Sequence, residues 1–104
     1  MKRVIRDGMV AVLYSPGFGA GWSTWASREI REAVMFDPAM VGLVEQKKFE
    51  ELEAFVALKY PGLFTGGLKH LQICWIPEGL QFRISEYDGS ERIEFRDGVD
   101  WITA

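Results

Sequence analysis

The strongest constraint on the fold of this chain is an unbroken apolar run, Met9–Tyr14. A strand with one face in water alternates polar and apolar side chains, whereas a strand buried on both faces is apolar throughout. The run therefore predicts a central strand that is covered on both sides. Asp7-Gly8 just before it is a strong hairpin signal, because a tight turn needs positive φ at its centre. We expect Lys2–Arg6 to pair with the central strand across this turn.

The clearest alternation lies near the C-terminal end of the chain. Apolar side chains occupy every second position on both sides of Tyr87–Ser90. This pattern predicts an antiparallel hairpin with one face on the core and the other in water. The expected strands are Leu80–Glu86 and Glu91–Arg96, and the side chains expected to face the core are those of Leu80, Phe82, Ile84, Ile93 and Phe95.

Two more segments have strand character. Leu71–Ile76 is largely apolar and stops at Pro77-Glu78-Gly79, and we expect it beside the central strand. Trp101–Ile102 follows the turn signal Asp97-Gly98 and would add a last short strand.

The middle of the chain carries helix signals. Ser27 can cap a helix that runs to Phe36. Asp37-Pro38 is typical of an N-cap followed by proline at the first helical position. Apolar side chains then recur at helical spacing as far as Tyr60, where Pro61-Gly62 ends the helical region.

This order of elements predicts an α+β fold. We expect one domain, residues 1–104, with an antiparallel sheet of about five strands and two or three helices packed on one face. The chain order is two strands, then the helices, then three strands.

Composition limits the classes of function. A net charge of -3 argues against a general nucleic-acid binder, although an acidic face can still dock on a basic partner. The first residues lack the apolar core of a signal peptide, and no apolar run has membrane-spanning length. We therefore expect a cytoplasmic protein without membrane contact. The single cysteine, Cys74, excludes an intrachain disulfide and is expected to be a small buried apolar residue.

The candidate site is the glycine-rich and aromatic segment that follows the central strand. A loop between a buried strand and a helix can present backbone N–H groups to an anion or a partner carbonyl, and glycine leaves that backbone uncovered. Exposed aromatic side chains can then act as anchors or stack on a base. The predicted ligand- or partner-binding residues are Ser15, Gly17, Phe18, Gly19, Gly21, Trp22, Ser23, Thr24 and Trp25.

The segment completes no known phosphate motif. Trp22 occupies the last glycine position of a dinucleotide-binding pattern, and it also stands where a Walker A loop needs lysine. A second interpretation is therefore open, in which the loop is only a tight connection and its aromatic rings fold over the core.

Catalytic groups are few. His70 and Cys74 could form a nucleophile and base pair, and the hydroxyls of Ser15, Ser23 and Thr24 are alternatives, but no orienting third group is evident. We predict no metal, because the chain has too few ligands, and no cofactor. The acidic side chains Glu50, Glu51, Glu53, Glu91 and Glu94 are interpreted as solvated faces.

The segment SPGFGAGWSTW, together with VIRDGMVAVLY before it and FRISEYDGSERIEF near the end, resembles a group of small uncharacterised proteins of bacteriophages and bacteria. The resemblance covers most of the chain. It implies a phage-type setting in the host cytoplasm, and it carries over no catalytic residue. Small phage proteins without enzyme motifs often bind host factors or sequester host signalling molecules, which makes an anti-defence role one option.

Two functional hypotheses follow. The first is a non-enzymatic binding protein that uses the glycine-rich loop against a host protein or a small, nucleotide-like ligand. The second is a small enzyme that uses Cys74 and His70 or a loop hydroxyl. The lack of a nucleophile, base and orienting set favours the first. We also predict a homodimer, because the terminal strands are unpaired and aromatic surface is plentiful for the size.

Overall fold

The computed structural model describes residues 2–17, 21–95 and 102–104. The described part combines helices with antiparallel strands, which confirms the α+β class. In chain order the elements are β1 (Ile5–Arg6), β2 (Met9–Tyr14), the 3-10 turn η1 (Ser23–Trp25), α1 (Arg31–Phe36), α2 (Pro38–Glu45), α3 (Phe49–Lys59), the 3-10 turn η2 (Leu68–His70), β3 (Gln72–Pro77), β4 (Gln81–Tyr87), β5 (Ser90–Phe95) and β6 (Ile102–Thr103).

The strands form two sheets, so the expected single sheet of about five strands is wrong. One sheet has the order β1-β2-β3 and the other has the order β5-β4-β6. Since β2 has β1 on one edge and β3 on the other, it offers no free edge to β4. The chain instead turns after β3 at Gly79, where φ is +90°, and β4 begins a second sheet.

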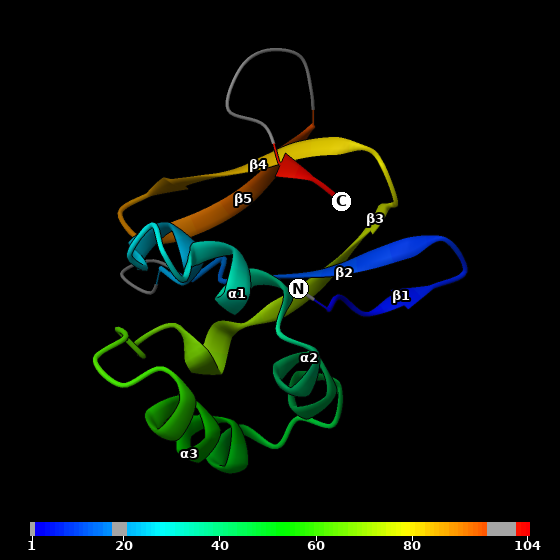
Figure 1. The fold of residues 1–104 in the computed structure, drawn as a ribbon. Coiled ribbons are helices and arrows are strands. Elements are labelled where there is room, and N and C mark those ends of the chain that lie inside the picture. Colours follow the sequence, from blue (N-terminus) through cyan, green and yellow to red (C-terminus); the bar gives the residue numbers. More distant parts are fainter. Residues whose placement is uncertain (1, 18–20, 96–101) are drawn as a thin grey trace.

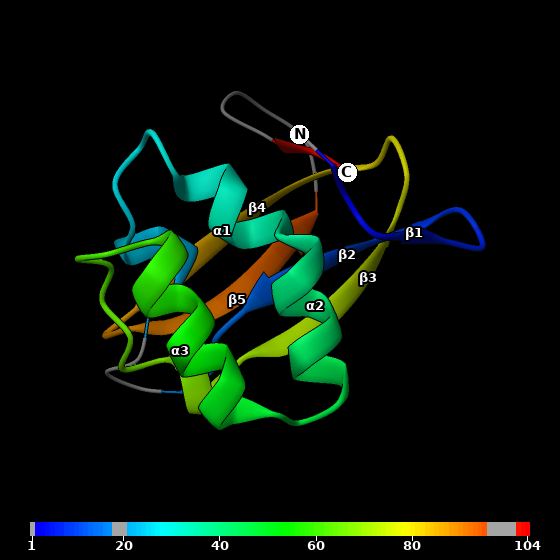
Figure 2. The ribbon, with the colours of Figure 1, turned by 60° about the horizontal axis from the view of Figure 1, so that its bottom comes forward.

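The two sheets and the helices are arranged in layers. Figure 1 shows β4 and β5 above the β1-β2-β3 sheet, with α2 and α3 below it. In Figure 2 the three α-helices lie side by side in front of the strands. No helix in the described part of the chain is both long and apolar enough to cross a bilayer.

The layered arrangement explains why β2 lacks alternation. Ala11 and Leu13 pack in the core cluster that includes α2 and α3, whereas Val10 and Val12 pack in the cluster that includes Phe82 of β4. Each of these four β2 side chains is fully buried. The expectation of a central strand covered on both sides is confirmed, and the second sheet provides the second cover.

The pairing partners of β2 are also as expected. Asp7 and Gly8 form the turn to β1 with φ of 51° and 76°. β3 pairs antiparallel with β2, with Cys74 opposite Val12.

The C-terminal hairpin forms in the expected register. Ile84 lies opposite Ile93 and Phe82 opposite Phe95, and the turn has positive φ at Asp88 and Gly89. Phe82 is fully buried and packs edge-on against Phe36 at 6.3 Å between ring centroids.

Two side chains expected in the core lie on the surface. Leu80 is 42% exposed because it belongs to the turn before β4, where alternation does not apply. Phe95 is 54% exposed at the end of β5, which is the edge strand of its sheet. Alternation predicts which face of a strand a side chain lies on. The side chain is buried only where another layer of the fold covers that face.

Of the two predicted helix starts, one is wrong and one is confirmed. The expected cap at Ser27 is wrong, because the Ile30 amide bonds the Ser27 carbonyl in a turn and α1 begins only at Arg31. The expected start at Asp37 is confirmed: its carboxylate accepts hydrogen bonds from the amides of Ala39 and Met40, and Pro38 opens α2.

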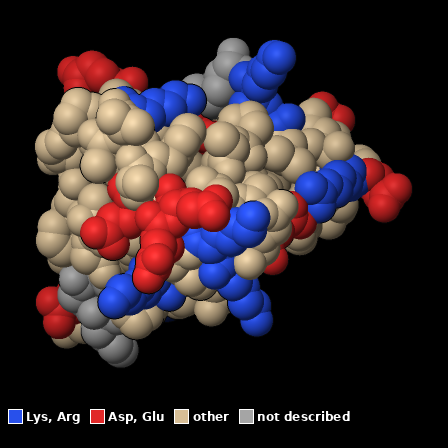
Figure 3. Space-filling model, turned by 90° about the horizontal axis from the view of Figure 1, so that it is seen from below, with Lys and Arg blue, Asp and Glu red and all other residues tan. Residues whose placement is uncertain are grey.

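The exposed face of the helical layer is acidic at its centre. Figure 3 shows acidic side chains gathered there, with basic side chains beside them. Glu50, Glu51 and Glu53 of α3 are all exposed, so their interpretation as a solvated face is confirmed.

We expect Phe82→Ala to lower the free energy of unfolding by about 3–5 kcal/mol, because it leaves a cavity between β4 and α1. Phe95→Ala is the matched control, since it removes the same ring from an exposed position and should cost less than about 1 kcal/mol. Urea denaturation measures both losses. Equal losses would show that the burial assigned to these two positions is wrong.

We expect Asp37 to make stability depend on acidic pH. Burial alone raises its pKa, but the hydrogen bonds from Lys59, Tyr60 and the Met40 amide outweigh burial, and the pKa lies below its usual value. The stabilisation is therefore complete above the unfolded-state pKa of about 3.9 and is lost as pH falls through the lower folded-state value. Asp37→Asn keeps a capping oxygen but loses the charge.

The measurement is the free energy of unfolding against pH for wild type and Asp37→Asn. The difference between the two curves should be largest near neutral pH and should shrink below pH ~4. Glu53→Gln, which alters an exposed carboxylate of α3, is the control and should leave the wild-type pH dependence intact. A difference that stays constant down to the lowest pH would contradict the assignment.

Candidate functional site

The glycine-rich segment leaves β2 at Ser15 and enters η1 at Ser23. The structure places Ser15 and Ser23 in the interior, both with no exposed surface. Thr24 is partly buried, and Trp25 is 40% exposed. Phe18 and Gly19 lie outside the described residues.

One carboxylate, that of Glu91, holds this segment. Its Oε1 accepts a hydrogen bond from the Ser15 amide at 2.9 Å. Its Oε2 accepts from the amides of Trp22 and Thr24 at 2.8 and 3.0 Å, and also from the Thr24 hydroxyl. The Glu91 amide in turn donates to the Ser15 carbonyl at 2.8 Å.

Glu91 is therefore an internal anion for the loop. Backbone N–H groups that converge in this way form a concave site for negative charge, and here the occupant belongs to the chain itself. The amides of Ser15, Trp22 and Thr24 are used within the fold, so an outside phosphate would have to displace Glu91 to reach them.

The interpretation of Glu91 as part of a solvated face is wrong, since it is 1% exposed. It stands two residues before Ile93 on β5 and shares the inner face of the hairpin with it. The alternation that places Ile93 on the inner face also places Glu91 there, and this is the signal in the sequence that identifies Glu91.

Trp22 is a core residue. It is fully buried, and its indole N–H donates to the carbonyl of Val34 at 2.9 Å. A surface role for Trp22, as an anchor or a lid, is therefore wrong in this fold, and the alternative in which its ring folds over the core is correct for this residue.

Two loop glycines allow close approach of rings. A Cβ at Gly21 would lie 2.6 Å from the Trp25 ring, and a Cβ at Gly17 would lie 2.7 Å from the His70 ring. The glycines therefore serve contacts with side chains of this chain.

The exposed part of the segment is aromatic. The rings of Trp25 and Phe64 are in contact, with centroids 4.8 Å apart and planes tilted by 53°. Phe64 is 44% exposed, and Gly66 lies so close that a Cβ there would be 2.5 Å from its ring. We call this the Trp25–Phe64 face. Phe64 is not among the predicted site residues, because no local pattern connects it with Trp25, which lies 39 positions earlier.

The two groups of the enzyme hypothesis belong to different elements. His70 ends η2 and is exposed, whereas Cys74 lies in β3 and is partly buried. Burial raises the pKa of the Cys74 thiol, so it stays protonated at neutral pH and is a poor nucleophile. Its expected packing role is consistent with its place beside the core cluster of Val12 and Phe82.

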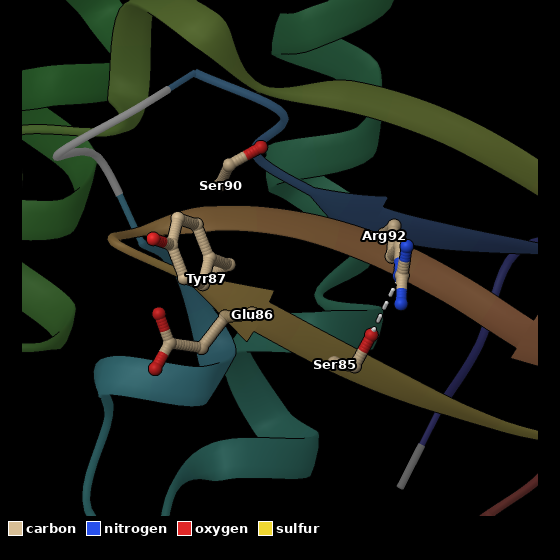
Figure 4. A pocket seen from close by; sticks show the side chains of 5 residues that line it. All are labelled: Ser85, Glu86, Tyr87, Ser90 and Arg92. Atoms are coloured by element: carbon tan, nitrogen blue, oxygen red, sulfur yellow. Dashed lines mark hydrogen bonds between the residues drawn. The ribbon is translucent and has the colours of Figure 1, made fainter.

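A large open hollow lies beside the β4–β5 turn. It has a volume of about 510 Å³ and is lined by Ser85, Glu86, Tyr87, Ser90 and Arg92. In Figure 4, Arg92 and Ser85 are joined by a hydrogen bond, while Glu86 and Tyr87 lie nearer the turn. Glu86 accepts from the Gly89 amide, and Ser90 donates to the Pro16 carbonyl of the glycine-rich segment. Its polar groups are thus engaged in holding the turn and the loop.

The described residues hold no group of three or more His, Cys, Asp or Glu side chains that could bind a metal ion. Comparisons of the chain with family models, curated proteins and solved structures give no match.

We expect Glu91→Gln to destabilise the fold by about 2–4 kcal/mol, because the amide replaces a charged acceptor and turns an N–H toward other donors. Glu94→Gln is the control on the same strand, where the carboxylate pairs with Arg83 at the surface and the change should matter little. Chemical denaturation gives the loss, and amide exchange at Trp22 and Thr24 should become faster in Glu91→Gln only. Unchanged exchange at both amides would contradict the role of Glu91.

Proposed function

We propose that this protein is a non-enzymatic binding protein that docks on another protein through the Trp25–Phe64 face. The observation that carries the proposal is the exposure of two large aromatic rings in mutual contact. Tryptophan is enriched among the residues that anchor protein interfaces. Contiguous exposed apolar side chains often mark interaction sites on soluble proteins.

The face is also held in place before binding. Trp25 ends η1, and the preceding residue, Thr24, is bonded to Glu91 by both its amide and its hydroxyl. The chain around Phe64 folds back closely enough that Gly66 contacts the ring. A prearranged surface loses less conformational entropy on association, so more of the contact free energy remains as affinity.

The shape favours a protein over a nucleobase. The two rings already touch, so a base cannot insert between them, and the amides suited to a phosphate are bonded to Glu91. The net charge of -3 adds nothing to phosphate binding. The resemblance to small bacteriophage and bacterial proteins makes a bacterial host protein the partner that we propose.

The enzyme alternative has less support. It needs a reactive nucleophile next to a base, whereas Cys74 has a raised pKa and His70 lies on another element. We therefore propose binding without covalent chemistry.

We expect Trp25→Ala and Phe64→Ala each to weaken partner binding about tenfold or more, which is the loss typical of an interface anchor. The measurement is capture from a bacterial lysate on immobilised protein, followed by titration of the captured species. Tyr87→Ala is the control, since Tyr87 is 79% exposed on the β4–β5 hairpin and outside the face.

Thermal melting should be nearly the same for the three variants and the wild type, so that lost capture reports on the surface. The proposal is wrong if Trp25→Ala and Phe64→Ala retain the same partner with wild-type affinity. It is also wrong if Tyr87→Ala alone abolishes capture.

A further inference from the structure

A small hollow lies beside η1. It has a volume of about 220 Å³ and lies between η1, α1, β4 and Ile102 of β6. Its polar lining comes from Ser23, Thr24, Arg31 and Arg83, and Met35 and Ile84 contribute apolar wall.

Two residues of this lining each carry a buried polar atom that has no hydrogen-bond partner among the described residues. The atoms are the Ser23 hydroxyl oxygen and the Arg31 Nε. Ser23 is fully buried, and the Arg31 guanidinium makes one described hydrogen bond, from Nη2 to the Ala26 carbonyl at 3.2 Å. An unpaired buried donor is costly, so such groups are seldom left in one place without a reason.

Two other hollows of the described surface differ in this respect. In the hollow beside the β4–β5 turn, Ser85, Glu86 and Ser90 each have a hydrogen-bond partner. In the hollow beside Asp37, that carboxylate is bonded by Lys59 and Tyr60. At the hollow beside η1, the lining residues Ser23 and Arg31 instead carry buried donors without described acceptors, which is the condition of a site that awaits an acceptor.

We propose that this hollow binds a small oxyanion, held by the Arg31 guanidinium and the Ser23 hydroxyl. Arginine offers only donors and a fixed positive charge, so its complement is a phosphate or a carboxylate. Arg83 adds positive charge at the wall, although it also pairs with Glu94. Glu91 is bonded to the Thr24 hydroxyl, and its charge is spread over four donors, which weakens its repulsion of a ligand.

The volume limits the ligand. Whole cofactors and drug-sized molecules occupy about 300–1,000 Å³, so this hollow suits a free oxyanion or the terminal phosphate of a larger molecule. The two sources share one chemistry, and the experiment below distinguishes them. The site does not depend on the Trp25–Phe64 face, so the two proposals can fail separately.

The test is a titration of the ¹⁵N-labelled protein with inorganic phosphate, followed by NMR. The side-chain Nε–H resonance of Arg31 and the amides of Ser23 and Thr24 should shift together along one binding curve. Arg31→Gln and Ser23→Ala should each weaken binding about tenfold or more, since a hydrogen bond to a charged group is lost. Arg28→Gln is the matched control, because Arg28 is exposed in the same segment and is not part of the lining.

A parallel titration with adenosine monophosphate distinguishes the two sources. Binding at least as tight as that of phosphate would identify the terminal group of a larger ligand, whereas binding of phosphate alone would identify a free oxyanion, and both support the site. Ser23→Ala should be no less stable than the wild type without ligand, because it removes an unpaired hydroxyl. The proposal is overturned if neither compound moves the Arg31 Nε–H resonance at 20 mM, or if Arg28→Gln abolishes the shifts as fully as Arg31→Gln.

Discussion

The carboxylate of Glu91 is the interaction on which the arrangement of this protein depends. It lies at the start of β5 and accepts hydrogen bonds from the residue that follows β2, the residue before η1 and a residue within η1. Through these bonds one side chain joins the second sheet to the first and closes the glycine-rich segment. Hydrogen bonds to a buried carboxylate are stronger than those between neutral groups, and the loss of any donor would leave charge unpaired.

The layers of the fold are arranged around β2. β2 carries apolar side chains on both faces because α2 and α3 cover one face, while α1 and the β5-β4-β6 sheet cover the other. Its last residue, Tyr14, pairs with Gln72 of β3. Ser15 follows β2 and is bonded twice to Glu91, because its amide donates to the carboxylate and its carbonyl accepts from the Glu91 amide.

The groups of the loop differ in direction. Its inward groups, the indole of Trp22 and the amides around it, are paired within the fold. Its outward ring, Trp25, meets Phe64 at the surface. Between them, Ser23 lines a hollow together with Arg31. Our two proposals use these two surfaces of one short segment, whose backbone is fixed by a single internal charge.

The local elements could be predicted from the sequence, because their causes lie within a few residues of each other. Apolar continuity marked β2, positive-φ turns at Asp7-Gly8 and Asp88-Gly89 fixed two registers, and Asp37-Pro38 started α2. It also pointed to the glycine-rich segment as unusual, since several glycines and aromatic residues gather there.

Which groups this segment meets follows from the packing of distant elements. Glu91 is 76 residues from Ser15, and the burial of a carboxylate depends on donors that gather only when the layers close. The contact of Trp25 with Phe64 and the place of Ser23 and Arg31 around one hollow depend in the same way on where separate elements come to lie. Periodicity predicts the face of an element on which a residue lies. It does not predict which residues pack against that face, because these come from distant parts of the sequence. For this reason the contacts of Glu91 could not be predicted from the sequence.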